Sequence, residues 1–161
     1  MKNDHLEPRG AILGPGEPAP EFTLLDQHRG EWRLSEAVEK GPVVLCFFPL
    51  AFTEVCGSEM DCVQRDFDAW TSKGAQVVGV SCDSFATQKA WADQTGYGFP
   101  LLADMHRQVC HAYGLYWADL NVAARGTVIV ERGPEGTPVV RWSEGREVMK
   151  AMDFSEILSH V

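Results

Sequence analysis

A proline, a hydroxyl and a thiol stand close together in the stretch PLAFTEVC, residues 49–56, directly after the apolar run VVLCFF. The proline is expected to end a buried strand, so Cys56 should lie in the first turn of the helix that follows. At that place, unpaired backbone N–H groups and the helix dipole lower the pKa of a thiol and favour its nucleophilic thiolate. The pattern predicts a reactive cysteine. The alternative is an ordinary core cysteine, with Thr53 acting only as a helix cap.

The residue types around Cys56 suit a reaction at its sulfur. The Thr53 hydroxyl can accept one hydrogen bond and donate another, so it can bridge a thiolate and a bound peroxide oxygen. Pro49 has no N–H group and a rigid ring, which can shield the sulfur without competing for hydrogen bonds. Arg125, in ARGTVIV, precedes a predicted strand. If that strand lies near the helix start, its guanidinium can hold the thiolate and polarise an O–O bond.

The elements that position these residues follow from the hydrophobic pattern. Residues 43–48 are apolar without alternation, as in a strand buried on both faces. A helix is predicted from about residue 53 to 72, because apolar residues recur at helical spacing: Cys56, Met60, Val63, Phe67 and Trp70. Further elements are predicted at these positions: a hairpin at 21–25 and 31–34 followed by a brief helix capped by Ser35; a strand at 75–82; a helix from Asp83 or Ser84 to about Thr95; an extended segment at 99–102; a short helix at 105–113; a hairpin at 127–131 and 137–142; and a last helix from about Asp153.

Strands alternate with helices through the middle of the chain, and an antiparallel pair follows. This order predicts an α/β fold with a central mixed β-sheet flanked by helices. The carboxyl ends of its parallel strands should share one edge, where sites usually form. Residues 1–15 are rich in Gly and Pro and are expected to form an irregular arm, with residues 16–161 as a single domain.

Composition narrows the functional classes. The chain has 161 residues and a formal net charge of −9, which argues against nucleic acid or an anionic membrane as a partner. No run approaches the roughly 18 apolar residues of a membrane span, and the N-terminus lacks the apolar core of a signal peptide. A cytoplasmic location is therefore expected, where thiols mostly stay reduced.

Five cysteines cannot all pair within one chain, so at least one thiol is free. Cys46 lies in the apolar strand and is predicted to be core. Cys62, Cys82 and Cys110 remain candidates for a resolving cysteine, with an external thiol as the alternative. Cys62 follows Cys56 by six residues, about 9 Å along a helix, so these two sulfurs cannot bond without local unwinding.

Motifs for a metal or a cofactor are incomplete or absent in this sequence. His106 and Cys110 have the i, i+4 spacing of two ligands on one helix face, but no second pair follows. The chain has no CxxC motif and no phosphate-binding loop. The sequence therefore predicts neither a metal site nor an organic cofactor.

The set formed by Pro49, Thr53, Cys56 and Arg125 resembles the active-site signature of the peroxiredoxins, most of all the alkyl hydroperoxide reductase E type, whose members often rely on one essential cysteine. The similarity runs from about Gly14 to the end of the chain. It extends to further features: FFPLAFT, Glu59, Trp91, FPLLAD and AYGL.

The resemblance implies a thioredoxin-like fold and a thiol-dependent peroxidase that reduces hydrogen peroxide and organic hydroperoxides. It implies that Cys56 is the peroxidatic thiolate and becomes a sulfenic acid, with Thr53, Pro49 and Arg125 as catalytic partners and with Glu59 and Trp91 in support. Gly57 costs a helix about 1 kcal/mol relative to alanine, so this first turn is expected to unwind when Cys56 is oxidised.

The resemblance also implies a homodimer, with thioredoxin, glutaredoxin or a low-molecular-weight thiol as the reductant. Two functions of other classes remain alternatives. One is a peroxide sensor, or redox-regulated binding module, that passes the oxidation of Cys56 to a partner. The other is a holdase-like chaperone with a vestigial thiol. Sustained peroxide consumption distinguishes the enzyme from both.

Overall fold

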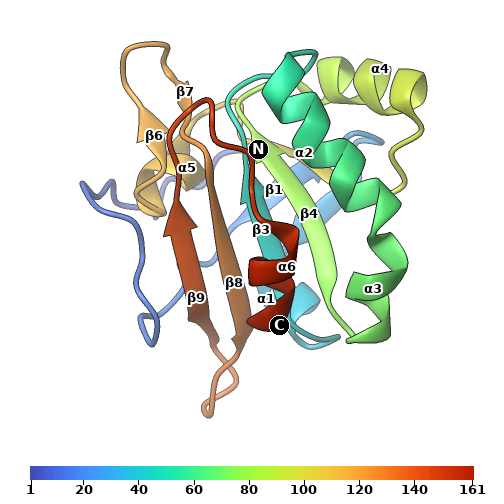
Figure 1. Ribbon diagram of the computed structural model, residues 1–161. Coiled ribbons are helices and arrows are strands. Elements are labelled where there is room, and N and C mark those ends of the chain that lie inside the picture. Colours follow the sequence, from blue (N-terminus) through green and yellow to red (C-terminus); the bar gives the residue numbers. More distant parts are fainter.

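A computed structural model describes all residues, 1–161. Its centre is a seven-stranded mixed sheet in the order β2-β1-β5-β4-β3-β8-β9 (Figure 1). The strands have these bounds: β1 Thr23–Asp26, β2 Glu31–Arg33, β3 Val43–Phe47, β4 Gln76–Ser81, β5 Leu101–Ala103, β8 Gly126–Arg132 and β9 Pro138–Gly145. The predicted α/β class with a mixed sheet is confirmed.

The middle of the sheet positions the site. β3 pairs parallel to β4 and antiparallel to β8, and β4 pairs parallel to β5. Every residue of β3 is buried, as its continuous apolar run predicts for a strand covered on both faces. The carboxyl ends of β3, β4 and β5 therefore lie along one edge, beside the beginning of β8.

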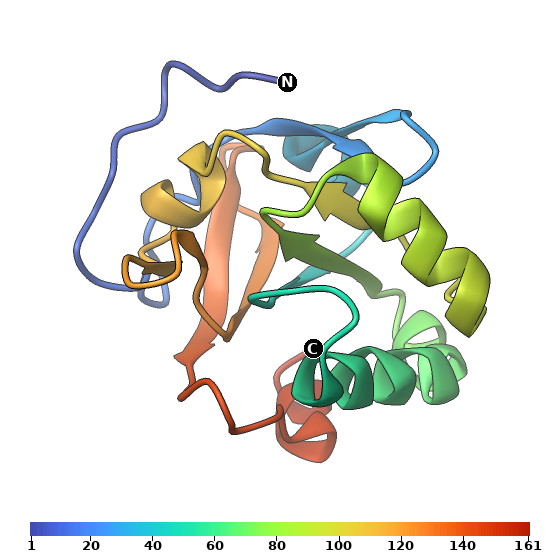
Figure 2. The same ribbon diagram turned by 90° about the horizontal axis from the view of Figure 1, so that it is seen from above.

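Helices cover both faces of this sheet, as the view from above shows (Figure 2). One face carries α2, α3, α4 and α6 over a core that includes Phe48, Met60 and Trp91. The other carries α1 and α5 over a larger core. The helices have these bounds: α1 Leu34–Val38, α2 Glu54–Arg65, α3 Phe67–Ser72, α4 Phe85–Thr95, α5 Gln108–Ala112 and α6 Phe154–Ser159.

Two helix predictions need correction. The helix predicted over 53–72 is divided at Asp66 into α2 and α3; its apolar stripe is continuous across the break, which is why periodicity alone does not reveal it. The brief helix predicted to be capped by Ser35 begins two residues earlier than that cap implies, at Leu34, with Arg33 at the N-cap position. The cap at Ser84 and the left-handed Gly96 that ends α4 are as predicted.

Two features lie outside the main sheet. A small hairpin of β6 (Tyr116–Trp117) and β7 (Val122–Ala123) was not predicted, because two-residue strands leave no periodic signal. Residues 1–15 contain no helix or strand, but Leu13 is buried in the core, and the N–H of Arg9 donates to the carbonyl of His111 in α5. The division of the chain after residue 15 stays a prediction.

None of the helices is both long enough and apolar enough to cross a bilayer.

Gly79, in β4, tests the close packing of the core on the face of the sheet that α2 covers. A Cβ atom added there would lie 2.7 Å from Leu101 Cδ2 and 3.1 Å from Phe48 Cε1, both in buried side chains. We expect Gly79→Ala to lower the free energy of unfolding by about 1–3 kcal/mol, the usual cost of overpacking, as measured by urea denaturation.

Gly57→Ala is the matched control. Nothing lies within 4 Å of a Cβ at Gly57, and alanine is about 1 kcal/mol better than glycine inside a helix. This variant should raise the free energy of unfolding. Equal changes in the free energy of unfolding for the two substitutions would contradict the close packing around Gly79.

Candidate active site

The loop between β3 and α2 carries Pro49 and Thr53 and is fastened to the end of β4. The N–H of Phe48 donates to the carbonyl of Val80 at 3.0 Å, and the N–H of Ala51 donates to Asp83 Oδ2 at 2.9 Å. This loop places the start of α2 at the edge formed by the carboxyl ends of the parallel strands.

Cys56 is the third residue of α2 and is 2% exposed. Its Sγ accepts a hydrogen bond from Arg125 Nη2 at 3.2 Å. In this first turn, the backbone N–H groups have no intrahelical acceptor and favour a negative charge. The sulfur therefore lies between a helix N-terminus and a guanidinium, two features that stabilise a thiolate.

The sheet register explains why Arg125, so distant in sequence, reaches Cys56. Phe47, the last residue of β3, pairs with Gly126, the first residue of β8. Arg125 consequently lies beside the segment that leads from β3 to α2. Its backbone is also tied to the far end of the β8–β9 hairpin, because its carbonyl accepts the N–H of Arg146 at 2.9 Å.

Arg125 is 2% exposed and its guanidinium is held on several sides. Nε donates to the carbonyl of Val148 at 2.7 Å, and Nη1 forms an ion pair with Glu59 Oε2. Glu59 lies one turn after Cys56 on α2. These contacts leave Nη2 directed at the sulfur.

The buried carboxylate of Glu59 also contacts residues of the C-terminal segment. Its Oε1 accepts the N–H of Met152 at 2.8 Å and a contact from Arg146 Nη2 at 3.4 Å. Burial raises the pKa of Glu59, and the guanidiniums of Arg125 and Arg146 oppose that rise. The carboxylate thus anchors two cations and the C-terminal segment.

Arg146 was missed by the sequence analysis. It lies just after β9, where its Nη1 also donates to Thr127 Oγ1 at 3.0 Å and to Glu144 Oε2 at 3.0 Å. The pairing of Gly126 with Gly145 in the β8–β9 hairpin brings it beside Arg125. No local motif marks such a residue, because its partner Glu59 is 87 positions away; only the hairpin register points to it.

Thr53 and Pro49 line the same pocket as Cys56 and Arg125. Thr53 stands at the N-cap position of α2, but its hydroxyl donates to the carbonyl of Leu50 at 2.8 Å and forms no cap hydrogen bond. The expected side-chain cap is therefore absent. The hydroxyl oxygen keeps acceptor capacity on the side of the pocket.

The pocket has a volume of about 220 Å³ and a mostly apolar wall. Leu120 and Met149, at its mouth, are 52% and 79% exposed. Its lining residues are Pro49, Leu50, Thr53, Glu54, Val55, Cys56, Trp117, Leu120, Arg125, Val148 and Met149. A larger hollow of about 460 Å³ between the β1–β2 turn and α4 contains no thiol, so the chemistry points to the smaller pocket.

Trp91 does not line the thiol pocket. It is 3% exposed, and its ring packs against Phe48 at 5.5 Å and Phe52 at 6.1 Å between ring centroids. Phe52 belongs to the active-site loop and has a φ of +62°, an unusual conformation for an aromatic residue. Trp91 supports that loop from the core.

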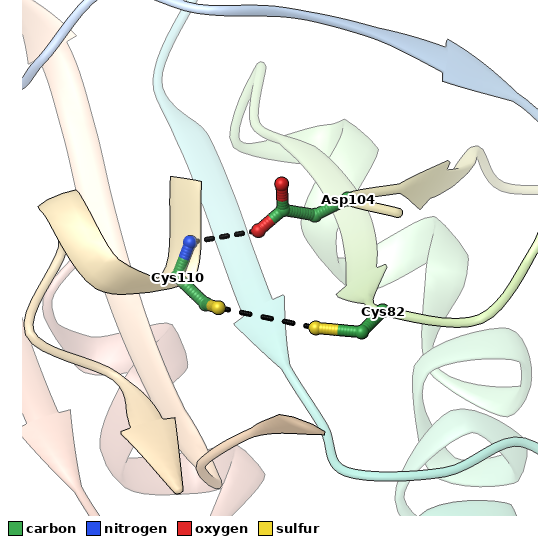
Figure 3. A group of neighbouring side chains, drawn as sticks. All are labelled: Cys82, Asp104 and Cys110. Carbon is green, nitrogen blue, oxygen red and sulfur yellow. Dashed lines mark hydrogen bonds between the residues drawn. The ribbon is translucent and has the colours of Figure 1, made fainter. Parts of the chain in front are cut away.

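The other cysteines differ in their surroundings. Cys46 is buried in β3, and burial raises the pKa of its thiol to about 12. Cys62 is half-buried near the end of α2, which is continuous from Cys56 onward. Cys82 and Cys110 point toward each other with 3.9 Å between their sulfur atoms (Figure 3). Their mutual contact and burial raise the pKa of Cys110.

Comparison with known proteins identifies the family of this chain. The AhpC/TSA family matches residues 15–135. Alkyl hydroperoxide reductase E of Mycobacterium tuberculosis is 33% identical over 144 residues, which cover 88% of this chain and 92% of that protein. The chloroplastic 2-cysteine peroxiredoxin of Chattonella marina var. antiqua is 34% identical over 151 residues, covering 85% of this chain and 76% of that protein.

Solved structures show the same fold. Peroxidoxin BcpB from Mycobacterium tuberculosis superposes with a TM-score of 0.82 at 25% identity, covering 92% of this chain and 96% of that one. The reduced 2-Cys peroxiredoxin of Plasmodium vivax superposes with a TM-score of 0.80 at 27% identity, covering 91% and 79%.

The sheet, the helices on its two faces and these relatives confirm the thioredoxin-like fold, and the relatives agree on the chemistry of a thiol that reduces peroxides. The chain belongs to the AhpC/TSA family: it is a peroxiredoxin, a thiol-dependent hydroperoxide reductase.

Proposed function

We propose that Cys56 is the peroxidatic cysteine. The observation that carries this proposal is the hydrogen bond from Arg125 to a thiol at a helix start inside a pocket. The Cys56 thiolate attacks the terminal peroxide oxygen, so an S–O bond forms while the O–O bond breaks. The leaving oxygen takes a proton and departs as water or an alcohol, and the cysteine becomes a sulfenic acid.

The neighbours of Cys56 have distinct roles in this proposal. Arg125 holds the thiolate and polarises the O–O bond as charge moves to the leaving oxygen. Thr53 accepts or donates a hydrogen bond to the peroxide, and Pro49 shields the sulfur from water. Glu59 acts through Arg125 and is therefore a positioning residue, as is Arg146, which acts through Glu59.

An external thiol recycles the sulfenic acid in this proposal. α2 is an unbroken helix between Cys56 and Cys62, which keeps those sulfurs apart. Cys82 and Cys110 contact each other and belong to, or pack against, the core on the opposite face of the sheet from Cys56. Thioredoxin, glutaredoxin and a low-molecular-weight thiol are the candidate reductants.

A homodimer in the cytoplasm is the assembly we propose. Three exposed apolar side chains line the pocket: Leu50, Leu120 and Met149. Exposed apolar residues gathered in one place are typical of contact surfaces. The same apolar rim supports organic hydroperoxides as substrates beside hydrogen peroxide.

Cys56→Ser is the first test of the peroxidatic role. The reduced wild-type chain, treated with one equivalent of hydrogen peroxide and a sulfenate trap, should gain one adduct by intact mass, and the Cys56→Ser variant should gain none. Cys62→Ser, the matched control in the same helix, should keep the adduct. Loss of two hydrogens without an adduct would mean a disulfide and contradict the external-thiol mechanism. If no rapid reaction with peroxide occurred, the peroxidatic role of Cys56 would be contradicted, and Cys56 would be an ordinary core cysteine.

Turnover separates the enzyme from the sensor. With excess thiol, the wild-type chain should consume many equivalents of peroxide. If peroxide consumption stopped after one equivalent with each candidate reductant, the peroxide-sensor function would be favoured instead.

Arg125→Lys tests the electrostatic role of the guanidinium. A lysine keeps the charge but cannot contact Cys56, Glu59 and the Val148 carbonyl together. We expect kcat/KM for peroxide to fall by about 100-fold or more, as when one oriented donor is lost. Arg132→Lys, at the exposed far end of the strand that Arg125 precedes, is the control and should leave kcat/KM unchanged. Equal rates in both variants would remove Arg125 from the mechanism.

Leu120→Asp tests the apolar rim. A carboxylate at the pocket mouth should lower kcat/KM for cumene hydroperoxide by about tenfold, the order of one lost apolar contact, with a smaller effect on hydrogen peroxide. Met105→Asp changes an exposed apolar residue outside the pocket and is the control. A parallel fall for both peroxides would contradict a substrate role for the rim.

A further inference from the structure

A second group of reactive side chains lies away from Cys56. Cys82 follows β4, Asp104 follows β5, and Cys110 lies in α5, so three elements bring them together (Figure 3). The two sulfurs are 3.9 Å apart, and all three ligand atoms lie within 4.8 Å of one another. The peroxidase chemistry at Cys56 uses none of them.

Asp104 is a buried carboxylate with no cation beside it. It is 1% exposed and forms no ion pair. Its partners are the N–H groups of Cys110 at 2.8 Å and of Val109 at 3.3 Å. The guanidinium of Arg107 is directed elsewhere, to the carbonyls of Met105 and Asn121. A buried charge is costly unless it is paired or binds a metal.

The distance between the two sulfur atoms fits a tetrahedral metal site. Two Zn–S bonds of about 2.3 Å at tetrahedral angles separate their sulfurs by about 3.8 Å, close to the 3.9 Å between Cys82 and Cys110. The N–H groups that hold the Asp104 carboxylate correspond to the outer-shell hydrogen bonds that orient metal ligands. Cys82 is half-buried, which gives the ion access to the site and leaves a fourth position for water.

We propose that Cys82, Asp104 and Cys110 bind one zinc ion. Both thiols lose their protons to the solvent as the two Zn–S bonds form, and no oxidation state changes. The bound ion would join the ends of β4 and β5 to α5. The sequence analysis predicted no metal site because these ligands come from three separate elements and have no motif spacing.

Cobalt binding tests the proposal directly. The chelator-treated, reduced Cys56→Ser chain is used, so that the active-site thiol does not contribute. We expect one Co²⁺ per chain, with a thiolate-to-cobalt charge-transfer band that Zn²⁺ displaces, and a higher melting temperature with Zn²⁺. The band should survive Cys62→Ser and be lost in Cys82→Ser and Cys110→Ser. Asp104→Asn should keep the band with at least about tenfold weaker binding.

Folding is checked for each variant by circular dichroism; Cys82→Ser, at a half-buried position, serves if the fully buried Cys110→Ser does not fold. A band that persists in folded Cys82→Ser would overturn the site. The absence of any band in the Cys56→Ser chain would also overturn the site. Peroxide treatment followed by peptide mapping would then show whether Cys82 and Cys110 form a disulfide instead.

Discussion

The buried charge chain from Cys56 through Arg125 and Glu59 to Arg146 is the constraint on which the site depends. Isolated charges inside a protein cost several kcal/mol each, so they are kept only when partners surround them. With Cys56 as a thiolate, two anions (Cys56 and Glu59) alternate with two cations (Arg125 and Arg146) along this series of buried contacts. Glu59 is central because its two carboxylate oxygens contact both guanidiniums, and this contact holds Arg125 with one N–H group directed at the sulfur.

This constraint explains why the C-terminal segment belongs to the site. The β8–β9 register brings Arg146 beside Arg125, and the chain then supplies the Val148 carbonyl and the Met152 N–H group. Each of these satisfies a group that α2 and β8 alone would leave unpaired in the interior. Segments distant in sequence are thus held together by the polar groups around Cys56 and Arg125.

Much of the fold and part of the site follow from the sequence. The apolar run of β3, the stripe on α2 and the Ser84 and Gly96 caps of α4 are local signals, and they predict their elements well. Pro49, Thr53 and Cys56 form a local motif in the same way, and Arg125 is found because it precedes a strand. The break at Asp66 and the small β6–β7 hairpin leave no periodic trace.

The missing parts of the site are those set by pairing between distant strands. Arg146 meets Glu59 only through the hairpin register, and Cys82 meets Cys110 only because β4 ends beside α5. No spacing rule along the chain reveals either contact. The direction of the Thr53 hydroxyl, which donates to Leu50, is equally a matter of loop geometry. The sequence therefore indicates the local motif around Cys56 more readily than the distant residues that hold it in place.

The burial of Cys56 has a mechanistic consequence. A small peroxide can enter a pocket of about 220 Å³, but a protein disulfide reductase must bring its own sulfur in line with a Cys56 sulfur that is 2% exposed. In the proposed mechanism the first turn of α2 would then open, and two features favour this: the Thr53 side chain does not cap the helix, and oxidation removes the thiolate charge that Arg125 holds. In the proposed mechanism, oxidation of Cys56 therefore weakens the contact from Arg125 that holds the sulfur in the pocket, which couples the chemistry to exposure of the sulfur.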